Sequence, residues 1–232
     1  MRGFAMSRVV RFISFAPTIA DGERARLAAH YAQLAEALPG LVRERNAPPL
    51  PGSVNGGDLV SHLVFDGERG WNEARVSPEW HAIEAFCARP EVTRSDWASY
   101  VLQHHGVREP DIAEGIHRVL LLAVRPETSA ERRAQFENEM RAMPHYLPAI
   151  RNWNLSRVSE CGGARSWTHV WEQDFRSPAD FFGPYMMHPI HFALIDRWFD
   201  PQSQDWIVDP ELCSTYCLSQ HAAIAQNDRK SA

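Results

Sequence analysis

One apolar segment occurs twice in this chain, first as Arg8-Val-Val-Arg-Phe-Ile-Ser-Phe-Ala-Pro17 and again as His117-Arg-Val-Leu-Leu-Leu-Ala-Val-Arg-Pro126, 109 residues later. The turn Leu38-Pro39-Gly40-Leu41 is repeated at the same spacing as Leu147-Pro148-Ala149-Ile150. A repeat of this length is too long for the unit of a solenoid. It therefore indicates that a whole module has been duplicated within one chain.

Each half contains the same order of strand and helix patterns. Strands are predicted at 8–16, 41–46 and 58–65, with helices at 22–38 and 77–87. The second half has strands at 117–125, 150–158, 166–173 and 211–218, with helices at 129–142 and 189–199. This β-α-β-β-α-β order is ferredoxin-like. We therefore predict an α+β protein in which two tandem ferredoxin-like modules form an α+β barrel.

Three segments make up the predicted domain organisation. The first module spans residues 1–106, the second spans 112–221, and a polar tail follows at 222–232. The second module contains an unbroken apolar run from Leu120 to Val124. Such a run is expected where both faces of a strand are shielded from water. A barrel would provide this shielding, closed either within the chain or by pairing with a second copy as a homodimer.

Composition excludes several classes of partner. The 232 residues carry a net charge of −5, from 24 basic and 29 acidic side chains, and no basic patch stands out. Nucleic acid is therefore not an expected partner. No apolar run approaches the ~18 residues needed to span a bilayer, and the N-terminal segment lacks the pattern of a signal peptide. The sequence predicts a cytoplasmic protein with no membrane partner.

The stretch Tyr185-Met-Met-His188-Pro189-Ile190-His191 has the pattern of an acid–base site at the start of a helix. Pro189 suits the first helical position, which makes His188 the cap and places His191 in the first turn. The positive end of the helix dipole disfavours a charged imidazole there. A neutral His191 can accept a proton, and Tyr185 can donate a hydrogen bond to a developing oxyanion. We therefore predict these two residues as catalytic.

Aromatic and histidine side chains alternate along the strand before this stretch. Trp167, His169 and Trp171 share one face, which suits a flat unsaturated ligand, while Glu172 belongs to the other face. Several histidines in one cavity could instead hold Zn²⁺ or Fe²⁺. Glu172 would then have to turn inward, against the alternation of the strand. We predict no metal and no cofactor.

The second half resembles a known family at three places. These are His117-Arg-Val-Leu-Leu-Leu, Trp167-Thr-His169-Val and Tyr185-x-x-His188-Pro189-x-His191. Over roughly residues 116–218 they resemble the stress-responsive A/B barrel (Dabb) domain of the dimeric α+β barrel superfamily, which includes olivetolic acid cyclase. The resemblance implies His191 as general base, Tyr185 as oxyanion stabiliser, and His117 and His169 as cavity histidines.

The first half follows the same pattern only in outline. Arg8 stands at the position of His117, Arg75 stands at the position of Tyr185, and His81 alone survives, opposite His191. The first module is therefore expected to have lost most of the site.

These observations predict a cofactor-independent lyase, cyclase or isomerase acting on a small carbonyl-bearing aromatic or polyketide-like compound. The catalytic residues are His191 and Tyr185, and the predicted substrate-binding residues are His169, His117, Trp167, Trp171 and His188. Two alternatives stay open. One is a monooxygenase of the same barrel superfamily, cofactor-free or haem-dependent. The other is a non-catalytic stress or ligand-binding protein.

Overall fold

The structure, a computed structural model, describes residues 6–224 and divides them into two compact units. The first unit contains the described residues up to Pro51 together with Gly56–Leu102 and Val158–Ser166. The second contains Gly52–Asn55, Gln103–Arg157 and the described residues from Trp167 onward. Each unit has one five-stranded antiparallel sheet with helices. The predicted α+β class with two ferredoxin-like modules is confirmed, whereas the boundaries at 1–106 and 112–221 stay a prediction.

The first unit contains the sheet β2-β3-β1-β4-β8. Its strands are β1 (Ser7–Phe15), β2 (Leu41–Ala47), β3 (Leu59–Phe65), β4 (Val92–Val101) and β8 (Glu160–Gly162). Its helices are α1 (Asp21–Glu36), α2 (Gly67–Ala74) and α3 (Pro78–Cys87), and apolar side chains of all three helices join those of β1 and β3 in one core. The predicted Leu-Pro-Gly turn joins α1 to β2, where Gly40 has a positive φ of 67° that suits glycine.

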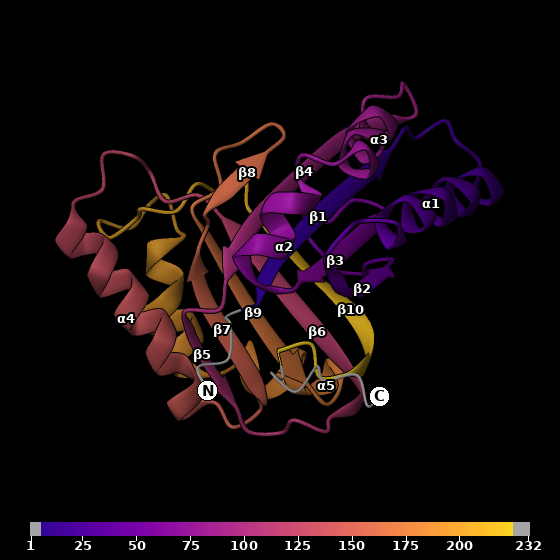
Figure 1. The fold of residues 1–232 in the computed structure, drawn as a ribbon. Coiled ribbons are helices and arrows are strands. Elements are labelled where there is room, and N and C mark those ends of the chain that lie inside the picture. The colour runs from indigo at the N-terminus through magenta and orange to yellow at the C-terminus, as the bar shows by residue number, and fades with distance from the viewer. Residues whose placement is uncertain (1–5, 225–232) are drawn as a thin grey trace. The chain divides into compact units, whose positions relative to one another are not determined.

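The second unit contains the sheet β10-β6-β9-β7-β5. Its strands are β5 (His104–Val107), β6 (Ala113–Leu122), β7 (Asn152–Arg157), β9 (His169–Phe175) and β10 (Cys213–His221). Its helices are α4 (Ala130–Tyr146), α5 (Pro178–Asp180), η1 (Phe181–Tyr185), η2 (Ile190–Ile195) and η3 (Asp196–Trp198). Figure 1 shows α4 running alongside the strands β5 and β7 of this sheet.

Alternation along β9 decides which side chains meet the helices of this unit. His169 contacts Phe136 of α4, and Phe175 contacts Phe181 of η1, so the odd-numbered side chains of β9 face the helices. Glu172 and Asp174 face the opposite side of the sheet. β6 is buried from Gly115 to Leu122, as expected for a strand covered on both faces.

Several elements differ from the sequence prediction. The strands β4, β5 and β8 and the helix α2 were not predicted. The predicted single helix 189–199 is instead the π-helical turn η2 followed by the 3₁₀ turn η3. The predicted polar tail 222–232 lies outside the described residues, apart from 222–224.

Within residues 6–224, no helix combines the length and the apolar character needed to cross a membrane. The cytoplasmic location stays a prediction.

Candidate active site

Tyr185 and His191 lie against each other, as the sequence motif predicts. Their ring centroids are 4.8 Å apart, with the rings inclined at 66°. Both are buried, Tyr185 with 2% and His191 with 9% of its surface exposed. Each belongs to a π-helical turn, η1 for the tyrosine and η2 for the histidine. Such turns are rare in proteins, and those that do occur are often found at functional sites.

Two prolines explain why the chain is irregular here. Pro184 lies inside η1 and Pro189 comes directly before η2, and neither can donate a backbone hydrogen bond to a continuous helix. The Nδ1 atom of His188 accepts a hydrogen bond from the backbone N–H of Ile190 at 3.2 Å. His188 therefore stabilises the start of η2 with its side chain, and its predicted contact with substrate stays a prediction.

Arg118 lies beside the tyrosine and was not among the predicted site residues. It is 6% exposed, and its Nη1 donates hydrogen bonds to Tyr185 Oη at 3.2 Å and to Gln173 Oε1 at 2.7 Å. Its Nη2 donates to Ser214 Oγ at 3.2 Å. The guanidinium carbon is also 5.4 Å from the centre of the Tyr185 ring and 5.3 Å from that of Phe181.

The sequence contained a signal for Arg118, since a charged residue within an apolar strand is unusual. The hydroxyl oxygen of Tyr185 accepts from Arg118, so its own proton is free to point toward another acceptor. The guanidinium also places a positive charge at the oxygen. This arrangement favours a partial negative charge on or near Tyr185 Oη.

A carboxylate faces the imidazole of His191. Its Nδ1 is 3.4 Å from Oδ1 of Asp196, at the start of η3, and the Asp196 side chain is 48% exposed. This is an ion-pair distance, and Nδ1 makes no aligned hydrogen bond with any residue in the described range 6–224. A carboxylate on this side can stabilise a proton on Nδ1, which leaves Nε2 as the nitrogen for a substrate.

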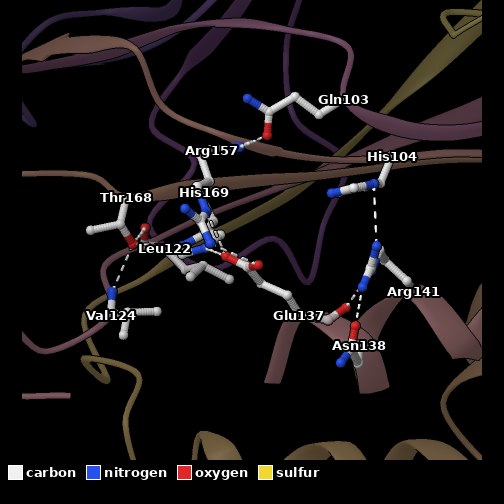
Figure 2. A network of polar contacts seen from close by, with 10 residues as sticks. All are labelled: Gln103, His104, Leu122, Val124, Glu137, Asn138, Arg141, Arg157, Thr168 and His169. Atoms are coloured by element: carbon white, nitrogen blue, oxygen red, sulfur yellow. Dashed lines mark hydrogen bonds and ion pairs between the residues drawn. The ribbon is translucent and has the colours of Figure 1, made fainter. Parts of the chain in front are cut away.

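His169 occupies a different place on the same face of the sheet, four residues or about 13 Å along β9 from Gln173. Its Nε2 is 2.9 Å from Glu137 Oε1, and its Nδ1 is 2.8 Å from Thr168 Oγ1. Arg157 donates to both oxygens of Glu137, from Nε at 2.8 Å and from Nη2 at 3.0 Å. Figure 2 shows Glu137 reaching from α4 to the histidine and the arginine on the sheet.

The Glu137 carboxylate is strongly stabilised as an anion. Burial by itself raises the pKa of Glu137, but the hydrogen bonds and charges of His169 and Arg157 outweigh it and lower the pKa to about 2. The three side chains line a cleft of about 240 Å³, together with Gln103, His104, Leu155 and Ser156. A substrate bound by His169 would therefore lie in this cleft. The predicted substrate-binding role of His169 stays a prediction.

His117 lies on the opposite face of the sheet from the other predicted histidines. It is 1% exposed, and its Nδ1 is 2.7 Å from Oδ1 of Asp174. In the pairing of β6 with β9, His117 lies opposite Asp174, whereas His169 lies opposite Leu122. Their sequence positions therefore put the two histidines on different faces, and the structure does not bring them into one cavity.

The predicted aromatic face packs against helices. Trp171 is fully buried on the side of β9 that faces α4 and η1, and Trp167, 4% exposed, comes just before the strand. Both indole Nε1 atoms are buried and make no hydrogen bond within the described part of the chain. Their predicted contact with substrate stays a prediction.

Comparison with known proteins supports the fold described above. Residues 116–209 match the sequence profile of the family described as the Stress responsive A/B Barrel Domain. No curated protein matches the sequence.

Several solved structures have a similar fold over nearly the whole chain. An anthrone oxidase-like protein has a TM-score of 0.67 at 10% identity, covering 100% of this chain and 98% of its own. A candidate monooxygenase from Fusobacterium nucleatum has a TM-score of 0.55 at 10% identity, covering 97% of both chains. Another, from Lactobacillus acidophilus, has a TM-score of 0.52 at 9% identity, covering 94% of this chain and 98% of its own. At such identities the similarity establishes the fold alone.

Proposed function

We propose that this chain, whose residues 116–209 form a stress responsive A/B barrel domain, is a cofactor-independent lyase, cyclase or isomerase for a small carbonyl-bearing aromatic or polyketide-like compound. The observation that carries the proposal is the contact between Tyr185 and His191 with Arg118 bound to the tyrosine hydroxyl. A general base, an oxyanion donor and a fixed cation are the groups that enolate chemistry requires.

The reaction begins with removal of a proton. Nε2 of His191 accepts it from a carbon next to a carbonyl, or from a phenol, while Asp196 stabilises the resulting imidazolium through Nδ1. The hydroxyl of Tyr185 donates a hydrogen bond to the substrate oxygen on which negative charge develops. Arg118 donates to the same hydroxyl oxygen and stabilises that charge through it. The enolate then forms or breaks a bond within the substrate, and His191 returns the proton.

Two features around the pair support an apolar substrate with polar oxygens. Arg118 Nε and Gln173 Nε2 are buried donors that make no hydrogen bond with the residues described, and a substrate oxygen could accept from them. Four large apolar side chains of the same segment are exposed, namely Phe182, Met186, Met187 and Phe192. Exposed apolar side chains mark a ligand-binding surface where they form one contiguous patch.

The experiment is a turnover assay against a panel of phenolic ketones and polyketide thioesters. Replacing His191 by Ala removes the base and should lower kcat by about 10²–10⁴-fold. Replacing Tyr185 by Phe removes the oxyanion donor and should lower kcat by about 10²–10³-fold. His145 and Tyr146, which are consecutive residues of α4, are both exposed and serve as controls. The variants His145→Ala and Tyr146→Phe are expected to keep full activity. Full activity in His191→Ala would rule out the proposed base.

Oxidation of an electron-rich phenol is the second candidate. The similar structures of an anthrone oxidase-like protein and of candidate monooxygenases support it. The same His191 and Tyr185 would then deprotonate and hold the phenol before it reacts with oxygen. Oxygen uptake that depends on a phenolic substrate would favour this candidate, and turnover under strict anaerobic conditions would favour the first.

A further inference from the structure

A cleft of about 360 Å³ lies within the first unit, between the end of α3 and the strand β4. Its lining includes Glu84 and Cys87 of α3, Ser95 and Trp97 of β4, and residues 163–164 after β8. A cavity of this size can hold a small organic molecule. Cys87 is a free cysteine whose side chain is partly exposed. Its thiol can therefore meet a molecule that enters the cleft.

A buried arginine donates a hydrogen bond to the sulfur of Cys87. Arg11 of β1 has no exposed surface, and its Nη1 donates to Cys87 Sγ at 3.1 Å and to Ser95 Oγ at 2.9 Å. Its Nη2 donates to the carboxylate of Glu84, and its guanidinium carbon is 4.9 Å from the centre of the Trp80 ring. These contacts with α3 and β4 fix the guanidinium in one position against the sulfur.

The arginine keeps its charge although it is buried. Burial by itself lowers the pKa of Arg11, but the interactions with Tyr31, Cys87 and Glu84 outweigh it and raise the pKa. A buried cation requires negative groups around it, and Glu84 compensates only in part, because its side chain is 43% exposed and solvent screens its charge. Nε of Arg11 is also buried and makes no hydrogen bond with any residue from 6 to 224. The guanidinium can therefore stabilise a second negative charge, on Cys87 Sγ.

The other charged or titratable groups near the sulfur leave this effect in place. Tyr31 of α1 is neutral near pH 7, because burial raises its pKa to about 12. Arg94, which also lines the cleft, pairs with the buried Asp96. Cys87 is the last residue of α3, and the negative end of a helix dipole disfavours an anion. A charge-assisted hydrogen bond from a buried cation is the stronger of the two effects, so the contact with Arg11 favours the thiolate.

We propose that Cys87 is a redox-modification site, at which a thiolate paired with Arg11 attacks small organic disulfides that enter the cleft. Sγ forms a bond to one sulfur of the disulfide, the original S–S bond breaks, and the other half leaves as a thiolate. The cysteine sulfur is oxidised and the leaving sulfur is reduced, so the small disulfide is the oxidant of the exchange. The site lies in the first unit and is independent of the proposed reaction at His191.

The experiment measures the rates of mixed-disulfide formation in the native chain with 2-hydroxyethyl disulfide, by peptide mapping and mass spectrometry. Cys161 is the matched control, because it belongs to the same unit, is also partly exposed, and contacts a backbone carbonyl at 3.9 Å rather than a cation. Cys87 should react about 5–10-fold faster at pH 7. The ratio of the two rates should fall about tenfold or more from about pH 6 to about pH 9.5, where both thiols ionise. Accessibility alone would give a ratio that does not change with pH.

Replacing Arg11 by Met removes the cation and should lower the rate at Cys87 toward that at Cys161. Arg11→Lys keeps the charge and should retain more of the rate than Arg11→Met does. Circular dichroism confirms that each variant is folded, and should neither variant fold, the pH dependence of the rate ratio in wild type decides by itself. No adduct at Cys87, a rate ratio independent of pH, or an unchanged rate in folded Arg11→Met would each overturn the proposal.

Discussion

Arg118 shows how one residue can connect stability and chemistry at the candidate active site. A buried guanidinium is costly unless its donors are satisfied. Here three side chains accept from it, Tyr185, Gln173 and Ser214, and two aromatic rings lie within cation–π distance. The arginine therefore fixes the position of the tyrosine hydroxyl as well as its electrostatic environment.

Replacing Arg118 by Met keeps much of the side-chain volume but removes every donor. The buried oxygens of Tyr185 and Gln173 then lose their partner, which should lower the free energy of unfolding by about 1–3 kcal/mol. Urea denaturation measures the change. Arg69→Met is the control, because Arg69 is 89% exposed and pairs with Glu73 at the surface; it should cost less than about 0.5 kcal/mol. Equal losses in the two variants would contradict the assigned role of Arg118.

At the scale of elements, Glu137 joins α4 to the sheet. Its carboxylate binds His169 of β9 and Arg157 of β7, so a single side chain bridges the helix and two strands (Figure 2). The hydrogen bonds to His169 and Arg157 explain why the pKa of Glu137 falls to about 2, although burial by itself raises it. The ionised carboxylate therefore adds a polar link to the apolar packing of Phe136, Met140 and Met143 that also holds α4 in place.

This attachment predicts an acid-sensitive contribution to stability. The pKa of Glu137 in the folded chain, about 2, lies below its ordinary value of 4.5. The contribution is therefore complete above pH 4.5 and is lost as the pH falls toward 2. Glu137→Gln should be less stable than wild type at pH 7 and should lose less stability between pH 4.5 and pH 2.

Denaturant titrations across this pH range measure the effect. Glu127→Gln is the control, since Glu127 forms a surface pair with Arg125 and its side chain is 58% exposed. The control should follow the wild-type curve. If the stability of Glu137→Gln also followed the wild-type curve, the Glu137 carboxylate would not be the group that makes the packing of α4 sensitive to pH.

At the scale of the whole molecule, the two compact units are not simple halves of the chain. The segment 158–166 belongs with the first unit, although it lies within the second half of the sequence. Its strand β8 pairs with β4, matching Gly162 with Trp97. Glu160 accepts a hydrogen bond from Trp71 Nε1 at 3.2 Å, and Ala164 N–H donates to Asp96 at 2.8 Å.

Replacing residues 158–166 by a Gly/Ser loop should therefore destabilise the first unit. Each lost hydrogen bond contributes about 0.5–1.5 kcal/mol, so a loss of at least about 1 kcal/mol is expected. Amide hydrogen exchange of β1, β3 and β4 at increasing urea concentration reports on this unit. A loop of the same composition in place of 200–205, which lies within the second unit, is the control. An unchanged unfolding midpoint for the first unit would contradict the role of β8.

The fold could be predicted further than the site could. The 109-residue repeat and the strand and helix patterns predict two ferredoxin-like modules, because each pattern reflects contacts within a short segment. The contact of Tyr185 with His191 was also predictable, since six positions along one irregular helical segment bring the rings together. Arg118 was missed because its partners are 55 or more positions away in the chain.

Pairing between strands that are far apart in the sequence decided which of the other polar side chains meet. The alternation of β9 separates His169 from Glu172, but only the packing of α4 and η1 decides which of those faces meets the helices. The register of β6 against β9 then places His117 beside Asp174 and Glu172, away from His169. The sequence by itself determined the class of two ferredoxin-like modules and the Tyr185–His191 pair, because residues close together in the chain encode them. The tertiary structure alone decided which distant polar groups meet, because a shift of one residue in strand register exchanges the two faces of a sheet.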